Sequence, residues 1–264
     1  MPKHNLNNYF PGQHTTRTRD LAEESRRIEQ LLADGKFQTN RSATIHFSRK
    51  IGSGALEIAH LLAPRIGYTV IDREIMEHIA NDARLGLQAA AYFDERYPGY
   101  LSNIKSMFDR EKKIVWDDYV HYLFSAVLVL ADLRPTICVG RGVHLIMPRH
   151  WVLSVRIIAS ENYRVQRFMR NQKLKEATAR KMLKKMDTEQ RLFFQRAFGK
   201  RQAEPSEFDM VINCDYLTDP SWVATIVEEY FRKKFAGEHG GSVNVLEASK
   251  QAAQMFDKED KIEV

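Results

Sequence analysis

Five short apolar runs, each about the length of a strand, recur along the chain between longer segments with helical spacing. The runs are ATIHFS (43–48), YTVID (68–72), PTICVG (135–140), WVLSVRIIAS (151–160) and DMVINC (209–214). The segments after the first and last runs, ALEIAHLLAPRIG and TDPSWVATIVEEYFRKKF, carry apolar residues at helical intervals. In the second segment we expect Asp219 or Thr218 to cap the helix and Pro220 to take its first position. Short apolar runs that alternate with helices are typical of a parallel sheet with helices on both faces. The pattern therefore predicts an α/β fold with a five-stranded parallel sheet.

The segments outside these runs divide the chain into one domain and two extensions. Residues 1–40 contain RTRDLAEESRRIEQLLADGK, which predicts an amphipathic helix that packs on the domain, on a protein partner or on a second copy of the chain. Residues 75–132 form a long helical region, with a break at DERYPGY (94–100). We expect residues 41–235 to be the domain and residues 236–264, which are Gly-rich and then charged, to be a weakly ordered tail.

The composition narrows the class of protein. The chain has 264 residues, of which 44% are hydrophobic and 28% charged, as in ordinary globular proteins. No apolar run reaches the roughly 18 residues that a membrane span needs, and the first residues lack the pattern of a secretory signal. We therefore expect a cytoplasmic protein that does not bind membranes. Cys138 and Cys214 lie inside apolar runs, where buried free thiols are expected.

Positive charge is concentrated in one segment. Residues 164–201 contain thirteen Lys or Arg against three Asp or Glu, a net charge of +10. Such a segment suits a nucleic-acid surface, a solvated helical face or a lid over a polyphosphate. Its aromatic residues have the spacing of core positions on a helix rather than that of an exposed stacking row, which argues against nucleic acid. They are Phe168, Phe193, Phe194 and Phe198.

The first apolar run ends in a glycine turn, SRKIGSGALEIA, which a helix follows. This order aims backbone N–H groups and the positive end of a helix at one point, which suits a phosphate. Against the phosphate-loop pattern G-x-x-x-x-G-K-[ST], Gly54 matches, but Ala55 replaces the lysine and Leu56 the hydroxyl. Arg49 and Lys50 are candidates for the missing cation, and exposed charge beside a plain turn is the alternative.

Charged residues also follow the other apolar runs. Asp72 and Arg73 end the second run, and Arg141 stands between two glycines after the third. Arg164 and Arg167 follow the fourth run by one helical turn. Ligands of open parallel sheets bind at the carboxyl ends of the strands, and a guanidinium holds phosphate through two hydrogen bonds. The residues predict an anion site, with a structural salt bridge between Arg141 and Asp72 as the alternative.

Taken in order, these motifs resemble those of the cytidylate kinase-like family, a branch of the P-loop nucleoside monophosphate kinases. The motifs are SRKIGSGALEIA, VIDRE, CVGRG, IIASENYRVQR, KKMDTEQR and MVINCD, and they span roughly residues 43–235. The resemblance implies a three-layer P-loop kinase fold in which residues 75–132 are a helical acceptor-binding insertion and residues 164–205 a helical lid. It also implies transfer of the ATP γ-phosphoryl group, with Mg²⁺, to a nucleoside monophosphate, CMP or dCMP.

The resemblance further implies roles for individual residues. It implies catalytic roles for Arg141, Arg167, Asp187 and Arg191; ATP-binding roles for Ser48, Arg49, Gly52, Ser53, Gly54 and Arg164; and acceptor-binding roles for Asp72, Arg73 and Arg141. No metal ligand follows from the sequence. Gly142 stands where the family has an aspartate that helps to read cytosine, so the acceptor base is left open. The alternative to an enzyme is a nucleotide-binding module without catalysis, with a sensing or scaffolding role.

Overall fold

The computed structural model of the protein describes residues 42–102, 106, 118–199 and 203–236, together with residues 23, 26 and 30. The expected C-terminal tail after residue 236 lies outside the described residues, as does the expected N-terminal helix apart from those three positions. Apart from residues 23, 26, 30 and 236, the described residues all belong to the expected domain, residues 41–235.

Five parallel strands form one sheet, in the order β2-β3-β1-β4-β5. They are β1 (Thr44–Arg49), β2 (Thr69–Ile71), β3 (Thr136–Val139), β4 (Val152–Ile158) and β5 (Met210–Asn213). Each predicted apolar run contains one of these strands, so the α/β prediction is confirmed. Strands β1 and β3 are neighbours, but the chain continues from β1 to β2 at one edge of the sheet and from β3 to β4 toward the other edge. Ligands of open α/β sheets bind at such a switch point.

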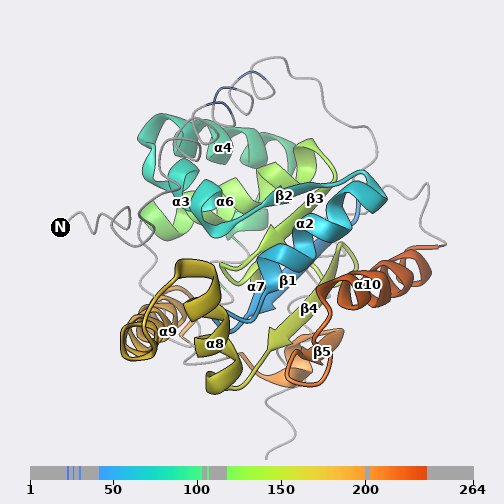
Figure 1. Ribbon diagram of the computed structural model, residues 1–264. Coiled ribbons are helices and arrows are strands. Elements are labelled where there is room, and N and C mark those ends of the chain that lie inside the picture. Colours follow the sequence, from blue (N-terminus) through green and yellow to red (C-terminus); the bar gives the residue numbers. More distant parts are fainter. Residues whose placement is uncertain are drawn as a thin grey trace, which may run out of the picture.

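Helices cover both faces of the sheet. On one face lie α2 (Ala55–Ile66) and α10 (Pro220–Lys234), and on the other lie α6 (Asp118–Leu133) and the short α7 (Val143–Ile146) (Figure 1). Side chains along β1 alternate between the two faces, as in any strand. Ile45 and Phe47 enter the core under α2 and α10, while Thr44, His46 and Ser48 are buried on the opposite face.

The expected helical region 75–132 contains three described helices: α3 (Arg73–Asn81), α4 (Ala83–Arg96) and α6. Asp72 and Asp82 cap the N-termini of α3 and α4, each accepting two backbone hydrogen bonds. The predicted break is confirmed, because α4 ends at Arg96 and Gly99 has a φ of 78°. Most side chains from Leu123 to Leu133 in α6 are buried, as expected of a core helix. No helix within the described part of the chain is long and apolar enough to cross a bilayer.

The basic segment folds into α8 (Glu161–Gln172) and the long α9 (Glu176–Phe198), which lie side by side (Figure 1). The first half of α9 packs with α8 in a small cluster of its own that includes Phe168 and Leu183. The last turns belong to the main core, where Phe194 and Phe198 are buried. The expected lid region 164–205 is thus anchored at the end of α9, because a rigid movement of that helix would expose both rings.

Two further local predictions concern the start of α10 and the two cysteines. Asp219 caps α10, accepting a hydrogen bond from the backbone N–H of Ser221 at 2.7 Å, and Pro220 takes the first helical position, as predicted. Cys138 and Cys214 are buried free thiols, which confirms the prediction for the cysteines.

Candidate functional site

The glycine turn between β1 and α2 has the backbone of a phosphate loop. Gly52 and Gly54 have φ values of 81° and 98°, in the left-handed region that favours glycine. A Cβ on Gly52 would lie 3.1 Å from the Phe168 ring, so a side chain there is also crowded. No side chain caps the N-terminus of α2. The turn therefore presents an uncapped helix end, which attracts an anion.

Ser53, between the two glycines, has a buried side chain. Its backbone N–H donates to the Lys50 carbonyl at 3.2 Å, and its Oγ has no hydrogen-bond partner among the described residues. Ser53 does not line either of the two cavities described next. Its contribution to the turn is through the backbone.

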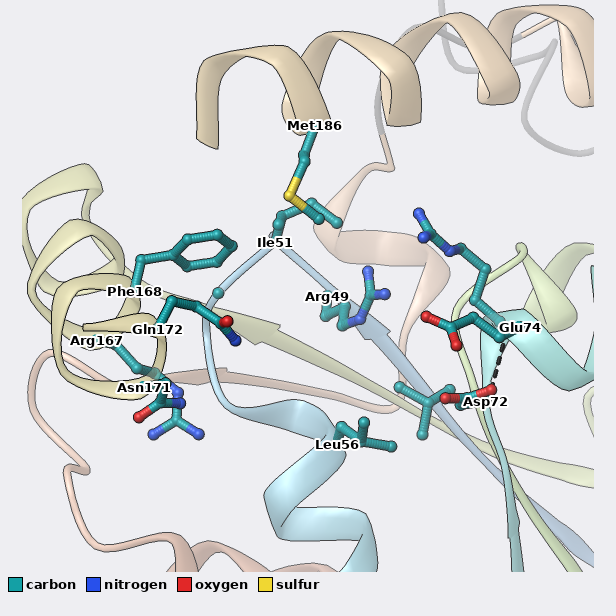
Figure 2. A pocket seen from close by; sticks show the side chains of 13 residues that line it. Arg49, Ile51, Leu56, Asp72, Glu74, Arg167, Phe168, Asn171, Gln172 and Met186 are labelled. Carbon is teal, nitrogen blue, oxygen red and sulfur yellow. Dashed lines mark hydrogen bonds between the residues drawn. The ribbon is translucent and has the colours of Figure 1, made fainter. Parts of the chain in front are cut away.

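The first cavity, of about 250 Å³, opens beside the glycine turn at the carboxyl end of the sheet. Figure 2 shows Arg49, Asp72 and Glu74 on one side of it and the α8 residues Phe168 and Gln172 on the other. The full lining is Arg49, Ile51, Gly52, Leu56, Asp72, Arg73, Glu74, Val139, Arg167, Phe168, Asn171, Gln172 and Met186. The cavity combines apolar side chains with charged groups on both sides, since Arg167 lies on the α8 side.

The second cavity, of about 420 Å³, lies between the turn after β3, the start of α6 and the end of α9. Its lining combines arginines with aromatic and aliphatic side chains: Arg49, Ile51, Arg73, Tyr119, Val120, Gly140, Arg141, Glu189, Gln190, Leu192, Phe193, Phe194, Arg196 and Ala197. Arg49, Ile51 and Arg73 line both cavities. The two cavities therefore meet at a pair of arginines.

Three arginines from the ends of neighbouring strands form a cluster at this junction. Burial, and then the charge of Arg73, lower the pKa of Arg49 to about 10, while Asp72 opposes the shift. Burial and the charges of Arg73 and Arg49 lower the pKa of Arg141 well below its usual value. The three cations are close enough to repel one another. A bound polyanion would remove that repulsion.

Glu77 of α3 is a carboxylate partner within this arginine cluster. It forms an ion pair with Arg141, and its Oε2 lies 3.9 Å from Nε of Arg73. The salt bridge of Arg141 weighed from the sequence is thus made with Glu77 rather than with Asp72. Asp72 instead caps α3, accepting hydrogen bonds from the backbone N–H groups of Glu74 and Ile75 at 2.9 and 3.1 Å.

Arg164 and Asp187 hold the turn and the basic helices together. The buried Nη1 of Arg164 donates to the Ile51 carbonyl at 3.1 Å and to both carboxylate oxygens of Asp187, at 3.0 and 2.9 Å. Neither residue lines either of the two described cavities. The pair joins α8 to α9 and to the glycine turn, which is a structural arrangement.

The remaining candidates differ in where they lie. Arg167 lines the first cavity and forms an ion pair with Glu57 of α2. Ser48 is buried and accepts a hydrogen bond from Arg156 at 2.7 Å, and Arg191 is exposed; neither lines either of the two described cavities. The structure therefore gathers one subset of the candidates around the cavities: Arg49, Gly52, Asp72, Arg73, Arg141 and Arg167.

Sequence reasoning missed several residues of the cavity walls, and it also missed Glu77, which pairs with Arg141 but lines neither cavity. Glu77 lies four residues after Arg73 and Asn171 four after Arg167, so helical spacing from a known candidate was a usable signal for both. Tyr119 and Phe193 carried no such signal, because their place depends on how α6 and α9 pack.

Gly142 follows Arg141 in the turn after β3. A Cβ at this position would lie 2.5 Å from the ring of Phe198, and Gly142 has a φ of 69°. There is no room here for any side chain, including the carboxylate that the resemblance leads one to look for.

The chain is similar to one known protein family and to several solved structures. A family model described as the cytidylate kinase-like family matches residues 44–216. Among solved structures, an uncharacterized protein from Eubacterium ventriosum matches with a TM-score of 0.57 at 19% identity, covering 74% of this chain and 99% of that one. Shikimate kinase from Bacteroides thetaiotaomicron matches with a TM-score of 0.37 at 11% identity, covering 72% and 96%. Dephospho-CoA kinase from Campylobacter jejuni gives 0.31 at 12% identity, covering 74% and 98%. No curated protein matches the chain.

Proposed function

We propose a phosphoryl-transfer reaction for this chain, which belongs to the cytidylate kinase-like family. In this reaction the γ-phosphoryl group of ATP passes to a nucleoside monophosphate. The observation that carries the proposal is the cluster of Arg49, Arg73 and Arg141 at the junction of the two cavities. Glu77 is one carboxylate against three cations, so the cluster keeps a net positive charge that a bound polyanion would balance. Transfer between two phosphate groups needs a cluster of cations that holds both of them.

The two cavities suit the two substrates. The first has the glycine turn and Arg167, so we assign it to the ATP phosphates. The second has Arg141 beside aromatic side chains, so we assign it to the monophosphate and its base. Arg49 and Arg73, which line both, would then face the group in transfer.

The chemistry asks little of the protein beyond position and charge. An oxygen of the acceptor phosphate attacks the γ-phosphorus, and the bond from that phosphorus to the β-bridging oxygen breaks. The products are a nucleoside diphosphate and ADP. The acceptor phosphate is already ionised at neutral pH, so no general base is needed. A guanidinium at the transferred group contributes about 10³ to 10⁵ in rate in other phosphoryl-transfer enzymes.

Arg49 takes the place of the missing loop lysine in this proposal. Ala55, at the lysine position, is buried, and Lys50 is exposed. Arg49 is partly buried and lines both cavities, so of the two candidates for the cation it is the one placed to reach phosphate.

Mg²⁺ is expected with ATP, and the site is compatible with it. Mg²⁺ is usually held by one or two carboxylates together with water and substrate phosphates. Asp72 and Glu74 line the first cavity and are the residues that would hold it. Among the described residues, no group of three or more acidic, His or Cys side chains forms a metal site by itself. When bound, the ion would neutralise charge on the phosphate oxygens.

CMP or dCMP is the proposed acceptor, on the resemblance alone. Gly142 has no side chain to read the base, and Phe198 fills the space beside it. Base selection would therefore fall to other groups of the second cavity, whose polar uncharged or acidic side chains are Tyr119, Glu189 and Gln190.

A second candidate function is a nucleotide-binding module without catalysis. The observation that favours it is Leu56, an aliphatic side chain that lines the first cavity where the phosphate-loop pattern has a metal-binding hydroxyl. Such a protein would bind ATP without transferring its phosphate, and its role would be to sense the nucleotide or to act as a scaffold.

A panel assay separates the two functions. The purified chain is incubated with Mg²⁺-ATP and, separately, CMP, dCMP, UMP, AMP and GMP, and ADP formation is measured. The proposed kinase forms ADP with a cytidine monophosphate and not with the purine monophosphates. Protection of the fold against heat by ATP without turnover would favour the module. No affinity for any nucleoside triphosphate would overturn both.

A further inference from the structure

A buried histidine lies directly behind the turn that carries Arg141. His46 is the third residue of β1, and its side chain is completely buried on the face of the strand that also holds Thr44 and Ser48. Its Nε2 lies 3.2 Å from the carbonyl oxygen of Gly140. Because a carbonyl only accepts hydrogen bonds, Nε2 must carry the proton in this contact.

This contact acts on an unusual stretch of backbone. Gly140, Arg141 and Gly142 have φ values of 98°, 55° and 69°, so three consecutive residues are left-handed. For Arg141 that conformation is disfavoured, because the Cβ of an L-residue crowds the backbone there. The arrangement needs outside support to persist.

Strand β1 supplies that support at both ends of Gly140. The N–H of Gly140 donates to the Phe47 carbonyl at 2.9 Å, which continues the ladder between β1 and β3. The carbonyl of Gly140 accepts from His46. That carbonyl belongs to the rigid peptide plane that joins Gly140 to Arg141, so its direction fixes the position of the backbone N and Cα of Arg141.

The imidazole of His46 is itself held in place. It stacks on His144 of α7, with ring centroids 5.1 Å apart and planes 11° apart. Nε2 of His144 lies 2.9 Å from a carboxylate oxygen of Glu207. Burial, and then the neighbouring His144, lower the pKa of His46, so the ring stays neutral and keeps one N–H. A buried ring with fixed neighbours can hold a backbone group in one direction.

We infer that His46 is a positioning residue for Arg141: its hydrogen bond to the Gly140 carbonyl holds the turn so that the guanidinium points into the second cavity. His46 lines neither cavity, so it acts through the turn and not by contact with a ligand. The kinetic test of this inference rests on the proposed function, whereas its structural test does not.

Three substitutions test the hydrogen bond separately from the packing. His46→Phe keeps a ring for His144 to stack on but removes the donor. His46→Gln places an amide N–H near the position of Nε2. Thr44→Val is the matched control, because it removes a buried polar atom on the same face of β1, one that has no hydrogen-bond partner among the described residues.

Two measurements are made on each variant. The first is the KM for CMP and, separately, for ATP, together with kcat. The second is hydrogen exchange of a peptide covering residues 138–146, which needs no substrate. His46→Phe is expected to raise the KM for CMP about tenfold, as the loss of a buried hydrogen bond would, with the KM for ATP within about twofold. It should also speed exchange in the peptide. His46→Gln should recover most of both effects, and Thr44→Val should resemble the wild type.

Two results would overturn the inference. One is a folded His46→Phe protein with wild-type exchange in the peptide; the other is a His46→Gln protein as impaired as His46→Phe, which would assign the effect to ring packing. If His46→Phe does not fold, His46→Asn replaces it, because its shorter amide stops near Nδ1. A wild-type protein without turnover on any monophosphate would count against the proposed function, and the exchange experiment would then decide the inference alone.

Discussion

The guanidinium of Arg141 lies over the ring of Phe193, with 4.0 Å between its central carbon and the ring centroid. The two residues come from the turn after β3 and from α9, so the contact joins the end of the sheet to the basic helix. A cation over an aromatic face is an attractive arrangement that also shields the charge from water. Because α9 is anchored in the core through Phe194 and Phe198, Arg141 is held against a fixed wall.

Replacing Arg141 by lysine should remove most of the proposed activity. Lysine keeps the charge but loses the planar fork that holds phosphate through two bonds and stacks on Phe193. We expect kcat/KM for CMP to fall by about 10² to 10³, with little change in melting temperature. Steady-state kinetics with thermal unfolding of the same samples measure both. Arg180→Lys, at an exposed position of the same basic segment, is the control, and unchanged turnover in Arg141→Lys would remove Arg141 from the site.

Phe193→Leu should weaken acceptor binding selectively. The substitution keeps an apolar side chain but removes the aromatic face under Arg141, an interaction of about 0.5 to 2 kcal/mol. We expect the KM for CMP to rise about threefold to tenfold and the KM for ATP to stay the same. Tyr230→Leu, on the exposed side of α10, is the comparison. Equal effects on both substrates would contradict the division of the two cavities.

Gly52→Ala should damage the ATP side. Alanine at a φ of 81° is strained by about 1 kcal/mol, and its Cβ would also press on Phe168. Gly67→Ala is a matched control, because Gly67 has a φ of 71° but no atoms near its Cβ position. Urea unfolding should show both variants destabilised, and Gly52→Ala the more so. ATP titration should show weaker binding in Gly52→Ala alone; equal ATP affinities would argue against the glycine turn as the ATP site.

The stability of the domain should fall at acidic pH because of His46. Its pKa in the folded protein lies well below 6.5, the usual value that it regains on unfolding. As the pH falls below about 6.5, the unfolded chain binds a proton that the folded chain refuses, so the free energy of unfolding decreases. Above that pH the contribution is fully present. Urea unfolding at several pH values between 8 and 5 should show a steeper loss in the wild type than in His46→Phe, and parallel curves would refute the assignment.

Asp187→Asn should loosen the junction of α8, α9 and the glycine turn. It weakens a charge-assisted hydrogen bond to the buried Arg164, whose bond to the Ile51 carbonyl remains. We expect a loss of about 1 to 2 kcal/mol in the free energy of unfolding, since the Asp187 side chain is partly exposed. Glu176→Gln, which breaks an exposed ion pair with Arg180 on the same helix, should cost almost nothing. Similar losses in the two variants would mean that the Arg164–Asp187 pair stabilises the fold no more than an exposed ion pair does.

Local features could be predicted from the sequence because their causes are local. The two-residue alternation of ATIHFS, the glycines of the turn and the Asp219-Pro220 start of α10 each follow from the conformations that a few neighbouring residues allow. The order of charged residues at the strand ends was also visible, because parallel strands bring their carboxyl ends to one edge. This was enough to find Arg49, Arg73 and Arg141.

The partners of these side chains could not be predicted in the same way. Asp187 and Arg191 are close in sequence on α9, yet Asp187 binds the buried Arg164 whereas Arg191 faces solvent. Arg141 pairs with Glu77, from a helix that the sequence showed only as part of a long helical region. Such pairings depend on which face each helix turns to the sheet.

The sequence by itself determined the strands, the glycine turn, the helix caps and the set of arginines, since each is decided by local sterics or by periodicity. Only the tertiary structure decided that β1 lies between β3 and β4 and so brings His46 to the Gly140 carbonyl. It likewise decided that the end of α9 lies against Arg141. The physical reason is that packing of distant segments, rather than local conformational preference, fixes which polar groups meet and which cations are left facing an open cavity.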